Sequence, residues 1–455
     1  MVFKRKLYDK MLRWKQESNG ETALLIEGAR RIGKSTLVEE FAKNEYKSFI
    51  LIDFSQNSEE VNGLFKDITD LDYLFLRLQV IYGTTLYERK SVIVFDEVQQ
   101  NPLARQAIKH LVKDHRYDYI ETGSLISIRK NIKDIVIPSE EVRLPMYPMD
   151  FEEFRWALGD TASIPLLRKL FESRKPLGDA AHRKMMRNFR LYMLVGGMPQ
   201  AVAKYIASND LSAVDTVKRG IISLYEEDFG KIDETGKAAA IFDAIPAQLS
   251  KNMSRYKISS VILGEKYDRV VEIVRLMEDS RVINAAFHCD DPNVGLALTK
   301  DPEYFKMYAG DTGLFVTMAF KSREFTDNII YQKLLSDKLD ANLGYVYENV
   351  VAQMLRATGK ELYYHTIRKA DGKGYYEVDF LIADGSKVSP IEVKSSGYTT
   401  HTSLDRFVEK YSSRVQNKYL VYTKDLKKDG NVLCIPIYLS LIHISEPRDL
   451  STSRM

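Results

Sequence analysis

The sequence is poor in cysteine and has no long apolar run, and each shortage argues against a class of protein. Two cysteines, Cys289 and Cys434, stand far apart among 455 residues and fit no metal-ligand spacing, which argues against a disulfide scaffold and against zinc. No apolar run approaches the roughly 18 residues of a membrane span, and the amino terminus carries charges where a signal peptide is apolar. We therefore expect a cytoplasmic protein without a membrane partner.

Charge of one sign is also scarce, because 66 basic and 63 acidic residues leave a formal net charge of only +3. Whole-molecule charge therefore neither requires nor excludes a polyanionic partner, and any nucleic-acid surface must be a local patch. The hydrophobic residues, 45% of the chain, suffice for about three domains with separate cores. Apolar residues near the amino terminus recur at helical spacing, which predicts a helix packed on the first domain. They are Phe3, Leu7, Met11 and Trp14.

Five apolar runs in the first third of the chain alternate with segments of helical spacing. The runs are ALLIEG, SFILIDF, SVIVFDE, YDYIETGS and EVRLPMYP. Alternation of strands and helices predicts a parallel, doubly wound sheet. In such a sheet, ligands bind at the carboxyl ends of the strands.

The pattern G-x-x-x-x-G-K-[ST] lies between the first run and a helical segment, as in a phosphate-binding loop. Its residues, with the next one, are Gly28, Ala29, Arg30, Arg31, Ile32, Gly33, Lys34, Ser35 and Thr36. Glycines let the backbone turn its N–H groups toward phosphate oxygens, and the helix adds the positive end of its dipole. We expect Lys34 to contact the β and γ phosphates and Ser35 to bind Mg²⁺. The alternative, a glycine turn with a solvated lysine, is disfavoured by this placement.

The third run ends in an acidic pair that suits a metal and a water molecule. Asp96 is predicted to hold Mg²⁺ through its water shell, and Glu97 to polarise the water that attacks the γ phosphate. The pair favours hydrolysis over transfer to a small molecule. In the fourth run, Thr122 or Ser124 can sense the γ phosphate if this strand lies between the strand before the glycine loop and the strand that ends in Asp96. Either hydroxyl can instead cap the next helix. We prefer Ser124 as the catalytic partner of Lys34 and Glu97. No N-K-x-D run follows, so ATP is preferred to a guanine nucleotide.

These motifs, GARRIGKST, FDEVQ and ETGSL, are followed by MYPMDFEEFRWALGD and YMLVGGMPQAV. Together they resemble bacterial and archaeal ATP-binding proteins that join an AAA-type P-loop ATPase domain to a carboxyl-terminal domain of unknown function, over nearly the whole chain. The resemblance implies the AAA/ASCE fold and ATP as ligand, and leaves the biological role open. No arginine is identified as a finger from a neighbouring subunit, since Arg129, Arg143 and Arg155 are each better explained as solvated or ion-paired.

The middle of the chain predicts a helical region and then a winged helix. A break at residues 196–199 interrupts the helical region, which we interpret as a lid or spacer. Helix, turn, helix and hairpin then follow in the order of a winged helix. Between residues 251 and 281, seven basic residues exceed five acidic ones by only two, so DNA and a protein partner stay open as alternatives.

The last third predicts a helix containing Glu348 and a hairpin around an Asp-Gly-Ser turn. A turn centred between residues 385 and 386 places Asp379 opposite Glu392. Alternation then places two sets of side chains on opposite faces. One set is Val378, Phe380, Ile382, Ile391 and Val393; the other is Glu377, Asp379, Glu392 and Lys394.

This D…E-x-K arrangement with an upstream helical glutamate is similar to the restriction-endonuclease-like fold. The resemblance implies that Asp379, Glu392 and Lys394 form the metal and catalytic set, with Glu348 as a further ligand of a second Mg²⁺ or Mn²⁺. The alternative is a solvent-facing surface on which Lys394 and other lysines neutralise the carboxylates.

The predicted fold class is multidomain α/β. Its parts are a P-loop ATPase domain with an N-terminal helix (1–165), a helical lid or spacer (166–235), a winged helix (236–325), a restriction-endonuclease-like domain (326–440) and a tail (441–455). The tail lacks the periodicity of the rest and resembles translated adapter sequence.

The predicted function is Mg²⁺-dependent ATP binding and hydrolysis, an ATP phosphohydrolase, coupled through the winged helix to the nuclease-like domain and acting on DNA. Metal-dependent nuclease activity is a secondary prediction. The alternative is a regulatory ATP-bound switch that contacts a protein partner or another copy of itself and carries an inactive nuclease-like domain. A small-molecule kinase is disfavoured by Glu97 and by the domains that follow.

Overall fold

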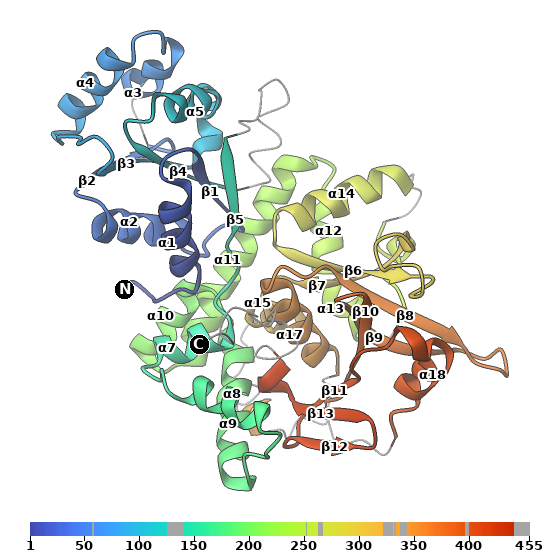
Figure 1. The fold of residues 1–455 in the computed structure, drawn as a ribbon. Helices are drawn as coiled ribbons and strands as arrows, with labels where there is room; N and C mark the ends of the chain where they lie inside the picture. The colour runs from blue at the N-terminus through green and yellow to red at the C-terminus, as the bar shows by residue number, and fades with distance from the viewer. Residues whose placement is uncertain are drawn as a thin grey trace. The chain divides into compact units, whose positions relative to one another are not determined.

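A computed structural model gives the fold of the chain (Figure 1). It describes residues 1–56, 59–124, 140–251, 253–262, 267–321, 331, 334–336, 344–395 and 400–440. The chain divides into two compact units: unit 1 comprises Met1–Tyr147 and Asp279–Arg281, and unit 2 comprises Pro148–Glu278 and Val282–Met455. Within the described ranges, no helix combines the length and the apolar character that crossing a membrane requires. The predicted tail and Arg129 lie outside these ranges.

Unit 1 contains the predicted parallel sheet. Its strands are β1 (Ala23–Glu27), β2 (Ser48–Asp53), β3 (Ser91–Asp96), β4 (Asp118–Gly123) and β5 (Glu141–Pro145). Neighbouring strands are parallel and follow the order β2-β3-β4-β1-β5. Strand β4 therefore lies between the strand that precedes the glycine loop and the strand that ends in Asp96, which is the condition set for a γ-phosphate sensor.

Helices cover both faces of this sheet (Figure 1). They are α1 (Leu7–Ser18), α2 (Lys34–Glu45), α3 (Glu59–Gly63), α4 (Leu71–Tyr82) and α5 (Pro102–Asp114), with the short helices η1 (Leu64–Lys66) and η2 (Val98–Gln100). Apolar residues of α3, α4 and α5 form one buried cluster with β2 and β3. On α1, the predicted stripe is buried at Leu7, Met11 and Trp14, and Tyr8 packs edge-on against Phe41 of α2 at 5.2 Å between ring centroids.

Side-chain caps fix where two of these helices begin. The Asp70 carboxylate accepts from the backbone N–H of Tyr73 at the start of α4, and the Asn101 side chain accepts from the N–H of Ala104 at the start of α5. Proline follows Asn101 at the first helical position, where a missing N–H removes no intrahelical bond. Sequence signals therefore set both boundaries.

Unit 2 begins with helices. They are α7 (Phe151–Ala157), α8 (Ser163–Glu172), α9 (Asp179–Val195), α10 (Pro199–Ser208), α11 (Leu211–Ile232), α12 (Lys237–Asp243), α13 (Ile245–Leu249) and η3 (Ile258–Ser260). Helix α7 starts with a complete capping box, because Asp150 caps Glu153 and the Glu153 side chain caps Asp150 in return. Gly196 and Gly197, which lie in the predicted break at residues 196–199, separate α9 from α10.

An eight-stranded sheet forms the second half of unit 2. Its members and flanking helices are α14 (Tyr267–Asp279), β6 (Ile283–Cys289), β7 (Lys300–Ala309), α15 (Thr312–Ala319), α17 (Gly344–Ala357), β8 (Leu362–Arg368), β9 (Tyr375–Asp384), β10 (Lys387–Val393), α18 (Thr402–Tyr411), η4 (Ser412–Arg414), β11 (Tyr419–Tyr422), β12 (Lys427–Asp429), β13 (Val432–Pro436) and η5 (Ile437–Leu439). The strand order is β12-β13-β11-β10-β9-β8-β6-β7. The hairpin expected in a winged helix, β6–β7, thus shares one sheet with the hairpin expected in the nuclease-like domain, β9–β10. The division into domains stays a prediction.

The β9–β10 hairpin has the register predicted from its turn. The pairs run from Asp384 opposite Lys387 to Phe380 opposite Ile391. The tight turn determines this register, because each strand residue further from the turn meets the residue equally far along the partner strand.

A β-bulge in β9 changes the predicted alternation of side chains. Tyr363 of β8 pairs with Leu381 of β9, and His365 pairs with Val378. The pairs are thus two residues apart in β8 and three residues apart in β9. Val378 and Leu381 therefore share a buried cluster with residues of α18, whereas the Phe380 ring packs on Tyr308 at 5.6 Å between centroids. The prediction that Val378 and Phe380 share a face is wrong, because the extra residue reverses the alternation at this point.

Candidate functional site

The loop between β1 and α2 is shaped by a close backbone approach and by positive φ angles. A Cβ atom at Gly28 would lie 2.4 Å from the carbonyl oxygen of Met146, so this position admits no side chain. The N–H of Met146 in turn donates to the carbonyl of Glu27 at 2.8 Å. Arg31 and Gly33 have φ angles of 64° and 90°, which curl the backbone before α2 begins. The loop therefore wraps around the space in front of the amino end of a helix, where an anion is stabilised.

The side chain of Lys34 folds back into this loop. Its ammonium is buried and donates to the carbonyl oxygens of Gly28 at 3.1 Å and Ala29 at 2.9 Å. Burial lowers the pKa of Lys34, and the carboxylates of Glu97 and Asp96 oppose that shift. The cation is thus held inside the loop, where an anion bound by the loop N–H groups would meet it.

Asp96 gathers hydroxyl groups from two other elements. The Ser35 hydroxyl, at the start of α2, donates to Asp96 Oδ1 at 2.8 Å, and the Thr122 hydroxyl of β4 donates to the same oxygen. The N–H of Glu97 donates to Thr122 Oγ1 at 3.3 Å. Ser124 is buried at the end of β4. Thr122 rather than Ser124 makes the contact with Asp96, and the sensor role of either residue stays a prediction.

Glu97 projects from a turn with a left-handed backbone. Its φ is 52°, immediately after the last residue of β3. The side-chain amide of Gln99, which is buried, donates to Glu97 Oε2 and so orients the carboxylate. Gln99 was not predicted as a site residue, although it is the last residue of the FDEVQ motif and lies three residues after β3 ends.

Two distant arginines, neither of them predicted as a site residue, also support the loop. Arg5 donates to the carbonyl of Ile32 at 3.0 Å and to the carbonyl of Tyr147 at 2.6 Å. Arg281 forms an ion pair with Glu27, the residue before Gly28, and donates to the hydroxyl of Tyr147 at 3.1 Å. Neither residue lies in a motif, so only the fold reveals them.

The remaining predicted residues of the loop lie where the motif places them. Arg30, Arg31 and Ile32 complete the turn, and Thr36 is exposed in the first turn of α2. Two arginines weighed as fingers are ion-paired instead: Arg143 with Glu141 at 2.7 Å, and Arg155 with Asp160 at 2.7 Å.

Two of the predicted carboxylates of unit 2 are buried, and Glu348 and Glu377 are partly exposed. Asp379 is 8% exposed and Glu392 is 4% exposed. Asp379 Oδ2 accepts from the backbone N–H of Val393 at 2.7 Å, and Glu392 Oε1 pairs with Lys394 at 2.6 Å. Asp379 and Glu392 are therefore buried, whereas the side chain of Lys394, which pairs with Glu392, is 39% exposed.

A lysine that was not predicted as a site residue lies beside these carboxylates. Lys306 of β7 is 5% exposed and forms an ion pair with Glu377 of β9. Its Nζ also lies 3.8 Å from Oε2 of Glu348, a predicted metal ligand. Among the described residues, no three or more His, Cys, Asp or Glu side chains are arranged to hold a metal ion. The donor set therefore does not fit a divalent cation in this arrangement, because an ammonium group pairs with Glu377 and lies 3.8 Å from Glu348.

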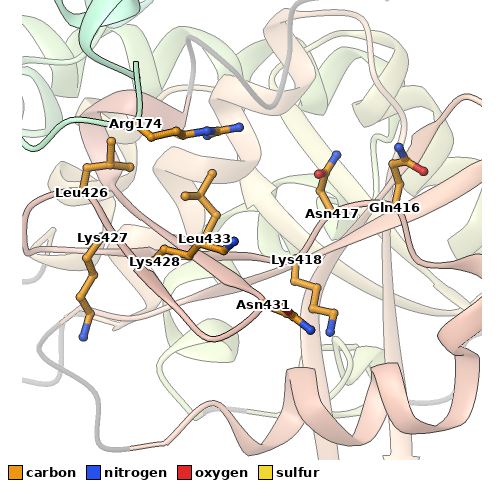
Figure 2. Close-up of a pocket in the computed structure, with 9 residues that line it drawn as sticks. All are labelled: Arg174, Gln416, Asn417, Lys418, Leu426, Lys427, Lys428, Asn431 and Leu433. Atoms are coloured by element: carbon orange, nitrogen blue, oxygen red, sulfur yellow. The ribbon is translucent and has the colours of Figure 1, made fainter. Parts of the chain in front are cut away.

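A basic hollow lies elsewhere in unit 2 (Figure 2). Its volume is about 490 Å³. It is lined by Arg174, Gln416, Asn417, Lys418, Leu426, Lys427, Lys428, Asn431 and Leu433. Figure 2 shows Lys418 and Lys427 extending in the same direction, away from Arg174. Four of the nine lining side chains are cationic and none is acidic, so the hollow suits an anionic partner.

Comparison with known proteins finds distant relatives. The uncharacterized protein MJ1637 of Methanocaldococcus jannaschii is 23% identical over 195 residues, which are 41% of this chain and 40% of that protein. The chain thus covers less than half the length of this curated relative. Among solved structures, the Thermotoga maritima RuvB Holliday junction branch migration motor aligns at 12% identity over 62% of this chain and 89% of its own, with a TM-score of 0.28. C. elegans PCH-2 aligns at 11% identity over 47% and 66%, with a TM-score of 0.22.

Three family models match successive parts of the chain. Residues 20–155 match a model described as AAA domain. Residues 186–324 and 343–439 match two models described as domains of unknown function, DUF8612 and DUF4143. The first match spans the glycine loop, Asp96 and Thr122. Residues 20–155 therefore form an AAA-type P-loop ATPase-like domain.

Proposed function

We propose that the AAA-type domain, residues 20–155, binds ATP with Mg²⁺ and hydrolyses it to ADP and phosphate. The observation that carries the proposal is the contact between Ser35 and Asp96, 61 residues apart, beside a buried Lys34 held by the loop. These three groups are what a bound magnesium nucleotide needs: a hydroxyl and a carboxylate for the ion, and an ammonium for the phosphates. Hydroxyl and carboxylate oxygens are ligands that Mg²⁺ prefers.

Each residue of the site would have a separate role in hydrolysis. Ser35 and Asp96 would hold Mg²⁺, which neutralises charge on the phosphate oxygens. Lys34 would exchange its two carbonyl partners for phosphate oxygens, which restores hydrogen bonds to a buried cation. Glu97 would accept a proton from the attacking water as oxygen bonds to the γ phosphorus and the bond to ADP breaks. Gln99 holds Glu97 in this structure, so Gln99 is a positioning residue.

Steady-state ATP turnover of the purified chain tests the proposal. Lys34→Ala should lose both ATP binding and hydrolysis, whereas Glu97→Gln should bind ATP and lose turnover by about 100-fold or more, the usual contribution of a general base. Lys43→Ala is the matched control, because Lys43 lies at the far end of α2 in an exposed pair with Glu39. Hydrolysis that survives in Lys34→Ala would refute the site.

We further propose duplex DNA as the partner to which turnover is coupled. Two observations support this: the basic hollow of unit 2, and the order of helix α14 and hairpin β6–β7, which is the order of helix and wing in the predicted winged helix. Residues 236–325 would then relay the nucleotide state to the nuclease-like residues 326–440.

Turnover measured against duplex DNA and salt tests the DNA partner. DNA should stimulate ATPase activity, and replacing Lys427 and Lys428 by Glu should weaken binding and lower the slope of log affinity against log salt by about 2, because each phosphate contact releases about one counterion. Lys373→Glu, in the exposed β8–β9 turn, is the control. No stimulation, or an unchanged slope, would favour the protein partner.

A second candidate is a regulatory ATP-bound switch whose nuclease-like domain does not cut. The observation that favours it is the ion pair of Lys306 with Glu377 beside the predicted metal ligands. This candidate predicts nucleotide that stays bound through purification, slow turnover that DNA does not change, and intact DNA in the presence of Mg²⁺ or Mn²⁺. Rapid DNA-stimulated turnover would exclude it.

A further inference from the structure

We propose that Lys306 is a built-in cation that takes the place of a divalent metal ion in the carboxylate cluster of unit 2. The cluster consists of Glu348 on α17, Glu377 and Asp379 on β9, and Glu392 on β10. The proposal rests on the proposed nuclease-like arrangement of residues 326–440 and is independent of ATP hydrolysis by unit 1.

The position of Lys306 supports this role. The side chain is 5% exposed, pairs with Glu377, and lies 3.8 Å from Glu348. A buried ammonium is stable only where carboxylates or other acceptors surround it. Lys306 therefore belongs to the cluster and does not merely border it.

Donor groups of the chain already engage the predicted metal ligands. The hydroxyl of Tyr308 lies 3.5 Å from Glu348 Oε2, and the N–H of Val393 donates to Asp379 at 2.7 Å. Lys394 pairs with one oxygen of Glu392 at 2.6 Å. The other oxygen, Oε2, is buried and has no hydrogen-bond partner among the described residues. A metal ion bound at these oxygens would have to compete with the donors that already engage them.

Electrostatics explain why an ammonium and a divalent ion exclude each other here. Four acidic side chains, of Glu348, Glu377, Asp379 and Glu392, belong to this cluster, and Asp379 and Glu392 are buried. Lys306, which pairs with Glu377 and lies 3.8 Å from Glu348, places one positive charge beside them. The cluster thus needs positive charge. Lys306 supplies it, and a divalent ion placed beside a fixed ammonium at low local dielectric would be repelled.

Removal of the ammonium should convert the cluster into a metal site. In Lys306→Met, the buried carboxylates lose their cation, so thermal stability should fall, and Mn²⁺ should restore it by binding the folded state. We expect saturating Mn²⁺ to raise the Tm of this variant by at least about 3 °C. Its Mn²⁺ affinity, measured without nucleotide, should exceed that of the wild type by at least about tenfold, the equivalent of about 1.4 kcal/mol. The wild-type Tm should not respond.

Three further variants make the test specific. Lys300→Met, an exposed lysine on the same strand, should behave as the wild type. Adding Asp379→Asn to Lys306→Met should abolish the Mn²⁺ response, which locates the ion. If the Lys306→Met variant does not fold, the double variant Lys306→Met with Glu377→Gln, which removes both charges of the pair, is compared with the wild type in the same Mn²⁺ measurements.

Several results would overturn the proposal. They are an equal Mn²⁺ response in wild type and variant, no response in either, or DNA cleavage by the wild type that Asp379→Asn abolishes. The ATPase assay on the same wild-type protein uses the loop of unit 1 alone, so a failure of the ATPase proposal would be seen separately.

Discussion

At the residue scale, unit 1 contains a buried arginine between two glutamate side chains. Arg105 of α5 is 1% exposed and lies 2.6 Å from Glu121 of β4 and 2.8 Å from Glu141 of β5. Such a set binds a helix to two strands through directional contacts. Breaking it by removing one partner costs about 3–5 kcal/mol, because the remaining charge stays buried.

The protonation of Glu121 should make the stability of the protein depend on pH. Burial raises the pKa of Glu121 to about 8; Arg105 opposes this shift and Glu141 adds to it. An unfolded glutamate titrates near pH 4.3. Between these values the folded protein holds a proton that the unfolded chain has lost, so the free energy of unfolding should decrease as pH rises from about 5 to 8.

Urea unfolding of Glu121→Gln at pH 5, 6.5 and 8 measures this contribution. Glutamine cannot ionise, so the stability of the variant relative to the wild type should increase steadily across the three values. Glu59→Gln, on the surface of α3, is the control, and its free energy of unfolding should change with pH as that of the wild type does. If the free energies of unfolding of Glu121→Gln and the wild type change equally with pH, the pKa of Glu121 is not raised by folding.

Residues of the candidate site were predictable where one local pattern defines them. Lys34 and Ser35 follow from eight consecutive letters, and Asp96 from the end of an apolar run. Lys306 and Arg281 were not predictable, because their partners lie 71 and 254 residues away and no local pattern encodes such a contact. Thr122 and Ser124 were equivalent in sequence, and only the register of β4 distinguishes them.

At the element scale, three segments of unit 2 meet at one point. The N–H of Met149, before α7, donates to the carbonyl of Gly197 at 2.7 Å, and the N–H of Gly197 donates to Asp311 Oδ2 at 2.6 Å. Asp311 also caps α15 through the N–H of Leu314. The glycine pair between α9 and α10 therefore does more than end a helix, because it lets the start of α7 and the start of α15 pack against the same backbone.

Gly197→Ala should disrupt this junction. An added Cβ atom would lie 2.1 Å from the carbonyl oxygen of Met149, a backbone atom that cannot move aside alone. We expect a loss of about 1–3 kcal/mol or more in the free energy of unfolding, as for other overpacked cores. Gly220→Ala is the matched control: its Cβ would meet nothing within 4 Å inside α11, so alanine should stabilise by up to about 1 kcal/mol. Equal effects of the two changes in chemical denaturation would contradict the packing argument.

Elements were predictable to the extent that their signals are local. The five strands of unit 1 each follow from one apolar run, and the β9–β10 register follows from one tight turn. The bulge at Asp379 and Phe380 could not be foreseen, because it arises where β9 pairs with β8 and not with β10. Pairing across the sheet likewise decides that β6–β7 extends the sheet of β9–β10, which no periodicity within either hairpin indicates.

At the scale of the whole molecule, the chain returns to unit 1 long after leaving it. Asp279–Arg281 belong to unit 1, whereas the residues on either side, Glu278 and Val282, belong to unit 2. This short return lies between α14 and β6. It places Arg281 against Glu27, the last residue of β1 before the glycine loop. A contact of this kind makes the loop depend on a segment that the domain match, residues 20–155, does not include.

ATP kinetics of Arg281→Ala should reveal that dependence. Without the guanidinium, the buried carboxylate of Glu27 loses its ion-pair partner directly beside Gly28, so the loop should spend less time in the curled form that binds phosphate. We expect KM for ATP to rise about tenfold, equivalent to about 1.4 kcal/mol, with kcat changed less, because Glu97 and Asp96 stay in place. Arg281→Lys keeps the positive charge but lacks the planar guanidinium, so its KM for ATP should lie between those of the wild type and Arg281→Ala. Arg275→Ala, exposed on α14, controls for loss of a basic residue nearby. If Arg281→Ala folds normally and binds ATP as the wild type does, the returning segment does not support the nucleotide site.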